Sequence, residues 1–151
     1  MRRFFIFSTP RSGSAWLANF LTYGGSFCQH EPLAAGEMVW HHYPVSGAVD
    51  TGASFVHYVP PEGVEVFHLW RDLAEVNWSL RRMGLPTYDM GDYKRGFDYQ
   101  RLFDVGYLEE VWGKVTELPF DRPRAKMLIE MNVQRDLGLL SEKMRTRTCL
   151  G

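Results

Sequence analysis

The chain has 151 residues, of which 45% are hydrophobic and 15% aromatic, which is enough apolar surface for the core of one ordinary domain. We therefore expect a single domain over residues 1–151 rather than two. The formal net charge is -1 and the pI is near 6.5, so no overall positive field favours nucleic acid, and any anion site has to be built locally.

Cysteine usage and hydrophobic runs exclude several further classes. The two cysteines, Cys28 and Cys149, have a spacing that matches neither a zinc nor a redox motif. Reduced thiols and a cytoplasmic location fit this best. The apolar run after MRR stops at Ser8, which is too short for an export signal, and no run approaches the length of a bilayer span, so we expect no membrane partner.

The first elements read as a strand, a turn and a helix. Residues 4–7, Phe-Phe-Ile-Phe, form an uninterrupted apolar run, which predicts a strand buried on both faces, as in a parallel sheet. From Ser14 the apolar residues recur at helical spacing, and Gly24-Gly25 ends the predicted helix.

The same pattern returns later in the chain. Residues 26–30 and 55–59 are predicted as short strands, and Val64–Trp70, VEVFHLW, as a stronger one. A helix over 72–83 follows, and Asp72 with Glu75 resembles a capping pair at its start.

The remaining chain predicts a loop and two helices. Residues 84–96 are rich in Gly, Pro, Asp and Tyr, which indicates a long surface loop. One helix is expected over about 99–118, and another is opened by Pro123 and continues through Leu137. Strands that alternate with helices indicate an α/β domain of three layers, a mostly parallel sheet flanked by helices.

The turn after the first strand has the composition of an anion site. In a parallel sheet, a turn from a strand's carboxyl end into a helix offers unpaired N–H groups and the positive end of the helix dipole. Gly13 permits close approach of a ligand, Ser12 and Ser14 add hydroxyls, and Arg11 adds a fixed charge suited to phosphate or sulfate. Such a turn is also typical of a plain connection with a capping serine and a solvated arginine. It lacks the second glycine and the lysine of a Walker A loop, which disfavours ordinary ATP or GTP use.

Two segments resemble the sulfotransferases that use 3′-phosphoadenosine-5′-phosphosulfate (PAPS). TPRSGSAW, residues 9–16, resembles their 5′-phosphate loop, commonly written TxPKSGTTW or PRSGST. HLWRDLAEVNWSL resembles their 3′-phosphate segment, because Arg71 ends a strand and Ser79 follows eight residues later, although Leu73 replaces the usual proline. Ser79 comes about two helical turns after Asp72 and so projects from the same helix face.

The resemblance implies a P-loop-like fold and a set of site residues. Arg11 would contact the leaving oxygen and the 5′-phosphate, and Arg71 and Ser79 the 3′-phosphate. The other implied contacts are Ser12, Gly13 and Ser14 with the phosphate oxygens, Ala15 through its backbone N–H, and Trp16 with the adenine face. Ala15 departs from the family pattern, in which many members carry a hydroxyl residue, so one side-chain hydrogen bond is missing.

The base that takes the acceptor's proton has three candidates. Glu31, in QHEPL, resembles the proposed base of bacterial and carbohydrate sulfotransferases, and we favour it. Its neighbour His30 is the alternative, because an imidazole near neutral pKa is an apt base, and His57 also competes because it lies closer to the second motif. His41-His42 show no recurring ligand spacing with the other histidines, so no metal is expected.

The function implied by the resemblance is sulfuryl transfer from PAPS to a hydroxyl or amine of a small-molecule or carbohydrate acceptor, with PAP as product. The resemblance covers residues 4–83, and the sequence shows no RKGxxGxW-like segment of the kind that closes on the nucleotide in many relatives. Two alternatives therefore remain: a non-catalytic protein that binds PAP or another nucleotide, and a small-molecule kinase.

Overall fold

The computed structural model describes residues 1–36, 38–53, 56–88 and 94–131. Its centre is a parallel sheet with the strand order β2-β3-β1-β4-β5. The strands are β1 (Arg2–Ser8), β2 (Ser26–His30), β3 (Val45–Asp50), β4 (Val64–Trp70) and β5 (Phe97–Asp98). The parallel sheet with flanking helices confirms the predicted α/β fold class.

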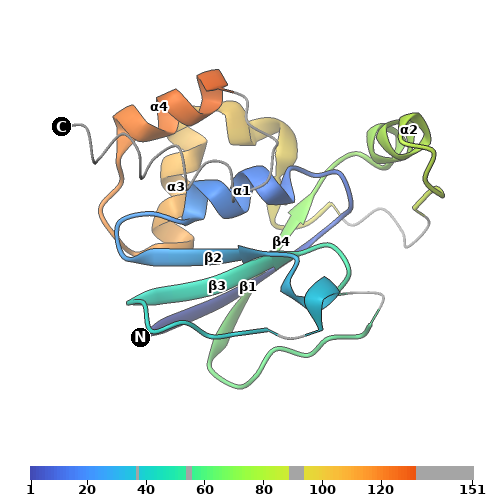
Figure 1. Cartoon of the computed structure of the whole chain (residues 1–151). Coiled ribbons are helices and arrows are strands. Elements are labelled where there is room, and N and C mark those ends of the chain that lie inside the picture. The colour runs from blue at the N-terminus through green and yellow to red at the C-terminus, as the bar shows by residue number, and fades with distance from the viewer. Residues whose placement is uncertain (37, 54–55, 89–93, 132–151) are drawn as a thin grey trace, which may run out of the picture.

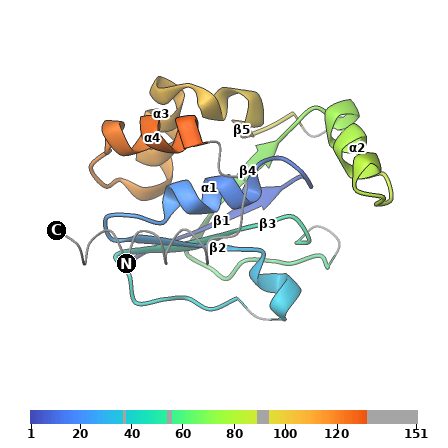
Figure 2. The ribbon, with the colours of Figure 1, turned by 45° about the horizontal axis from the view of Figure 1, so that its top comes forward.

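The helices are distributed unevenly around this sheet. They are α1 (Ser14–Leu21), α2 (Leu73–Arg82), α3 (Val105–Thr116) and α4 (Arg122–Met131), with 3-10 turns η1 (Pro32–Ala35) and η2 (Tyr99–Phe103). Helices α1, α3 and α4 cover one face, whereas η1 lies on the opposite side and α2 stands beyond the carboxyl ends of the strands (Figure 1, Figure 2). Among the described residues, no helix is both long and apolar enough to cross a bilayer.

Strand β1 lies in the middle of the sheet and packs on both sides. Phe4 and Ile6 belong to the large core beneath α1, α3 and α4, while Phe5 belongs to a smaller cluster on the other face. All three side chains are fully buried. The alternation follows from the period of two in a strand, and it confirms the prediction of a strand buried on both faces.

Two of the connections between strands lie on opposite faces of the sheet. Helix α1 joins β1 to β2 and packs in the large core, whereas the β3–β4 connection contributes Ala53 and Tyr58 to the cluster around Phe5. These two connections run across the sheet in opposite directions, so right-handed crossovers place them on opposite faces.

The strand predicted over residues 55–59 is wrong for the residues that the structure describes. Residues 56 and 57 form a turn, in which His57 has a left-handed φ of 49°, and residues 58 and 59 belong to no strand. The strand next to β1 is instead β3, VSGAVD, whose Gly47 faces the ring of Phe4 so closely that a Cβ would lie 2.5 Å from it. Pairing with β1 on one side and with β2 on the other explains a strand of this small and partly polar composition.

The single helix predicted over about 99–118 is divided. Turn η2 ends at Phe103, and Asp104 then caps α3 by accepting a hydrogen bond from the N–H of Tyr107 at 2.8 Å. Asp72 likewise caps α2 by accepting from Ala74 and Glu75, as predicted. The last predicted helix is confirmed as α4 up to Met131, and its predicted continuation through Leu137, like Cys149, lies outside the described residues.

Cys28 lies within β2 as a free and fully buried thiol. Burial raises the pKa of this thiol well above its ordinary value. The side chain therefore acts as a small core residue with no nucleophilic character.

Candidate functional site

The loop between β1 and α1 connects the carboxyl end of a strand to a helix, as the sequence predicts, and β1 is the central strand of the sheet. Within it Arg11 has φ 59° and Gly13 has φ 75°, so two left-handed residues turn the chain sharply into α1. Gly13 is the N-cap residue, and no side chain caps the helix there. The N–H groups of the first turn of α1 are thus left without a side-chain acceptor, which favours an anionic ligand.

Contacts of Ser12 with Thr9 and of Gly13 with Tyr99 hold the β1–α1 loop in place. Ser12 is fully buried and its hydroxyl is hydrogen-bonded to that of Thr9, so this side chain braces the loop. Gly13 lies against Tyr99, whose Cε2 would stand 2.9 Å from an added Cβ. Ser12 was predicted to contact a phosphate. Its backbone N–H is the group that can do so, because its hydroxyl is already hydrogen-bonded to Thr9.

A pocket of about 420 Å³ opens in front of this loop. Its lining includes Arg11, Gly13, Ser14, Ala15, Trp16, His30 and Glu31. The structure therefore brings the predicted phosphate loop and both favoured candidates for the base into one pocket. The volume lies in the range of pockets that bind small molecules and cofactors.

Polar side chains in this pocket are joined in a chain of contacts. The hydroxyl of Ser14 lies 3.1 Å from Nε2 of His30, and the same nitrogen lies 3.6 Å from Oε1 of Glu31. That carboxylate oxygen accepts a hydrogen bond of 2.5 Å from the hydroxyl of Thr51. Thr51, which follows β3, thus orients the carboxylate of Glu31, and Ser14, the first residue of α1, orients the imidazole of His30. An acid–base pair has to be positioned in this way.

Backbone strain is concentrated at these candidate residues. The described non-glycine residues with a left-handed φ are Arg11, Glu31, His57 and Glu117. Such conformations cost roughly 1–3 kcal/mol each and cluster at functional sites. Three of the four are residues that the sequence singles out for chemistry, whereas Glu117 follows the end of α3.

Arg71 and Ser79 both contact Arg11 of the loop. Nη1 of Arg71 donates to the carbonyl of Arg11 at 2.8 Å, and Nε of Arg11 donates to the hydroxyl of Ser79 at 3.0 Å. Arg71 also donates to Glu75 at 3.0 Å and stacks over the ring of Tyr99 at 4.3 Å. Both residues thus lie at the loop, although neither lines the pocket in front of it.

Trp16 has a different environment from the one that the resemblance implies. Its side chain is buried, its indole N–H donates to the carbonyl of Leu128 at 3.3 Å, and its ring stacks with Phe20. The indole therefore packs between α1 and α4 as a core residue. In this arrangement it offers no exposed ring face to an adenine.

Sequence reasoning missed part of the pocket wall. Thr51 follows β3, the strand that the pattern did not predict, and it reaches the pocket because β3 pairs with β1. Leu80, Met83 and Leu85 form an apolar wall at the end of α2. The amphipathic pattern of that helix could have indicated an apolar face, but not which loop it approaches.

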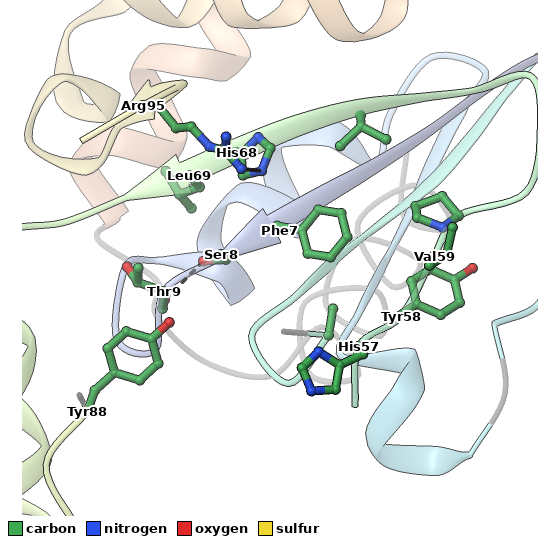
Figure 3. A pocket seen from close by; sticks show the side chains of 13 residues that line it. Phe7, Ser8, Thr9, His57, Tyr58, Val59, His68, Leu69, Tyr88 and Arg95 are labelled. Atoms are coloured by element: carbon green, nitrogen blue, oxygen red, sulfur yellow. Dashed lines mark hydrogen bonds between the residues drawn. The ribbon is translucent and has the colours of Figure 1, made fainter. Parts of the chain in front are cut away.

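His57 lies away from Glu31 and His30, in a second pocket of about 610 Å³. Figure 3 shows this pocket in front of the ring of Phe7, and its described lining includes none of the residues that line the loop pocket. Across residues 1–36, 38–53, 56–88 and 94–131, no three His, Cys, Asp or Glu side chains gather in a way that could hold a metal ion.

Comparisons with known proteins found no match for this chain. No protein-family model matches the chain. No curated protein and no solved structure matches it either.

Proposed function

We propose that this protein is a PAPS-dependent sulfotransferase that transfers a sulfuryl group to a hydroxyl or amine of a small-molecule or carbohydrate acceptor. The observation that carries the proposal is the loop pocket, in which Arg11 and Ser14 stand beside the His30–Glu31 pair. An anion cradle and a positioned proton acceptor in one pocket are the two requirements of in-line group transfer.

The hydrogen-bond donors and positive charges around the loop would hold the two phosphates of PAP. The uncapped first turn of α1, the hydroxyl of Ser14 and the guanidinium of Arg11 would hold the 5′-phosphate. Arg71 and Ser79, which both contact Arg11, would hold the 3′-phosphate. The apolar side chains at the end of α2, Leu80, Met83 and Leu85, would face the nucleotide's non-phosphate part.

In the transfer itself, the residues of the chain position the acceptor, move a proton and stabilise charge. When bound, PAPS supplies the sulfuryl group: the acceptor oxygen bonds to sulfur as the bond from sulfur to the 5′-phosphate oxygen breaks, and PAP leaves with that electron pair. Glu31 takes the acceptor's proton, and Thr51 holds its carboxylate in place. Arg11 stabilises the negative charge that develops at the leaving phosphate.

Titration with PAP, ATP and inorganic phosphate, followed by an assay of sulfuryl transfer from PAPS, tests this proposal. We expect PAP to bind more tightly than ATP or phosphate, and Arg11→Ala to abolish transfer. Arg81→Ala is the matched control, because Arg81 is exposed on α2 and does not line the pocket. Tight PAP binding without turnover would favour a non-catalytic binding protein, and preferential binding of ATP would favour a kinase. Unchanged PAP affinity in both Arg11→Ala and Arg71→Ala would contradict the assignment.

A further inference from the structure

The ring of Tyr99 contacts both of the segments that the proposed function assigns to the phosphates of PAP. The guanidinium of Arg71 stacks over this ring, with its Cζ 4.3 Å from the ring centroid. Two atoms of the same ring, Cε2 and Cδ2, lie 2.9 and 3.0 Å from the place that a Cβ on Gly13 would take. One side chain therefore separates the 5′-phosphate loop from the arginine assigned to the 3′-phosphate.

Tyr99 is held in place by the turn to which it belongs, η2. The carboxylate of Asp98 caps this turn by accepting a hydrogen bond of 2.9 Å from the N–H of Gln100, and the N–H of Asp98 donates to the hydroxyl of Tyr107 at 2.9 Å. The ring of Phe103 meets the ring of Tyr99 edge-on at 5.5 Å. The ring of Tyr99 thus has a fixed position from which it can support a neighbour.

Gln100, the next residue of η2, reaches the same arginine through Glu75. Its Nε2 donates to Oε1 of Glu75 at 3.0 Å, and Nε of Arg71 donates to Oε2 of that carboxylate at 3.0 Å. Nη1 of Arg71 donates to the carbonyl of Arg11. The guanidinium of Arg71 is therefore restrained at its flat face by Tyr99 and at two of its three nitrogens by hydrogen bonds.

The third nitrogen of this guanidinium can serve a ligand. Nη2 of Arg71 has no hydrogen-bond partner within the part of the chain that the structure describes, and the side chain is 19% exposed. Because a guanidinium is planar, its orientation fixes the direction from which a phosphate oxygen can approach. The contacts with η2 thus decide where a second phosphate of the nucleotide can be bound.

We propose that Tyr99, assisted by Gln100, makes the site specific for a phosphate at the 3′ position of the ribose. The ring of Tyr99 sets the place of Arg71 relative to the β1–α1 loop, and a 2′-phosphate, although equally charged, is displaced from a guanidinium held there. Tyr99 acts through Arg71 and is a positioning residue. This role rests on the proposed function, since it requires that PAP binds with its 5′-phosphate on the loop.

Calorimetric titration of the full chain with PAP and with its isomer adenosine 2′,5′-bisphosphate tests the proposal, because the two compounds have the same charge. We expect the unmodified chain to bind PAP about tenfold more tightly than the isomer. Tyr99→Leu should reduce this preference about fivefold, since the guanidinium loses its aromatic support. Tyr99→Phe keeps the ring and should retain the preference. An unchanged preference in Tyr99→Leu, or its loss in Tyr99→Phe, would overturn the proposal.

Phe103→Leu is the matched control for Tyr99→Leu. It removes an aromatic ring from the same turn, and that ring contacts Trp16 and Tyr99 but has no contact with Arg71. The preference for PAP over its isomer should stay unchanged, even if both affinities fall together. An equal reduction of the preference in the two variants would show that packing within η2 is responsible, and would contradict a role through Arg71.

Gln100→Met tests the same support without a change in the core, because Gln100 is exposed. Loss of its hydrogen bond to Glu75 should lower the preference for PAP over the isomer about threefold. Arg101→Met, at the next exposed position of η2, is the control, since Arg101 lies over the ring of Tyr107 instead. Equal preferences in these two variants would contradict the assistance of Gln100.

Titration of the unmodified chain with 5′-AMP separates this proposal from the proposed function. If PAP binds no more tightly than 5′-AMP, the chain has no site for the 3′-phosphate, and the proposed function fails together with the role of Tyr99. If PAP binds more tightly than 5′-AMP but no more tightly than its 2′,5′ isomer, the proposed function stands and the role of Tyr99 alone is refuted.

Discussion

Arg11 and Ser79 are joined by a hydrogen bond of 3.0 Å, across 68 positions of the chain. Because Arg71 also donates to the carbonyl of Arg11, the β1–α1 loop and the start and end of α2 form one connected unit. The two segments that resemble the sulfotransferase phosphate motifs thus meet at a single residue. This meeting point is where both phosphates of PAP would have to be held.

The first prediction concerns the 3′-phosphate. Arg71→Gln keeps a side-chain donor for the carbonyl of Arg11 but loses the charge, and it should weaken PAP about tenfold while leaving the affinity for 5′-AMP nearly unchanged. Ser79→Ala should act in the same direction with a smaller effect. Calorimetry with the two nucleotides measures the difference, and an equal loss for both would show that Arg71 does not read the 3′-phosphate.

The second prediction concerns the base. Glu31→Gln should lower kcat about 100-fold or more at unchanged PAP affinity, because the amide cannot accept the acceptor's proton. His30→Gln should lower kcat less, because His30 contacts the carboxylate of Glu31 but does not itself take the acceptor's proton in the proposed reaction.

Steady-state kinetics and PAP titration together provide the test of the base. Glu110→Gln, at an exposed position of α3, is the control and should match the unmodified chain. A larger loss of kcat in His30→Gln than in Glu31→Gln would transfer the role of the base to His30.

The third prediction concerns the packing behind the loop. Gly13→Ala should destabilise the fold by about 1–2 kcal/mol or more, because the residue has φ 75° and its Cβ would stand 2.9 Å from Tyr99. Gly113→Ala, within α3, is the matched control. A Cβ there meets nothing within 4 Å, so it should stabilise the chain by about 0.5–1 kcal/mol. Urea unfolding gives both values, and equal effects of the two substitutions would refute the packing of Tyr99 on the loop.

The fourth prediction concerns the helix that carries the phosphate site. Arg124 donates to the carbonyls of Asn19, Phe20 and Thr22 at the end of α1, and burial lowers its pKa to about 10, which leaves it charged at neutral pH. Arg124→Met should cost roughly 3 kcal/mol, because buried carbonyls lose a charged donor. Arg122→Met should cost less than about 1 kcal/mol, since Arg122 is half exposed and pairs with Glu109. Similar costs in the two variants would show that Arg124 does not anchor α1.

The fifth prediction concerns acid stability. The backbone N–H of Arg124 and the hydroxyl of Tyr23 donate to Asp121 and lower the pKa of its carboxyl below the ordinary 3.8. A depressed folded-state pKa adds stability above the unfolded-state value that is lost as pH falls through the folded-state value. The stability gap between the unmodified chain and Asp121→Asn should therefore shrink as the pH falls through the unfolded-state pKa and then through the lower folded-state pKa of this carboxyl. Denaturant midpoints measure it, and a gap independent of pH would contradict the contact.

The strand and helices around the phosphate loop could be predicted from the pattern of residues within each element. The apolar run of β1, the helical spacing after Ser14 and the capping Asp72 are encoded within a few residues of each element. Strand β2 has the predicted bounds. The loop's place between the carboxyl end of a buried strand and a helix followed from these elements alone, whereas the central position of β1 in the sheet comes from the structure.

Features that depend on contacts distant in sequence could not be predicted. Strand β3 has Ser and Gly in its middle and forms because it pairs with β1 and β2, and Thr51 enters the pocket only through that pairing. Residues 56–59 have the composition of a strand yet belong to none, and His57 among them has a left-handed conformation. Trp16 was expected to face a nucleotide, but its burial depends on α4, more than a hundred residues away.

A crystal structure of the chain with PAP bound tests the central claim most directly. We expect the 5′-phosphate over residues 11–16, the 3′-phosphate between Arg71 and Ser79, and Glu31 on the side where the acceptor would approach. A PAP molecule bound away from the β1–α1 loop, or with its phosphates turned away from Arg11, would contradict it.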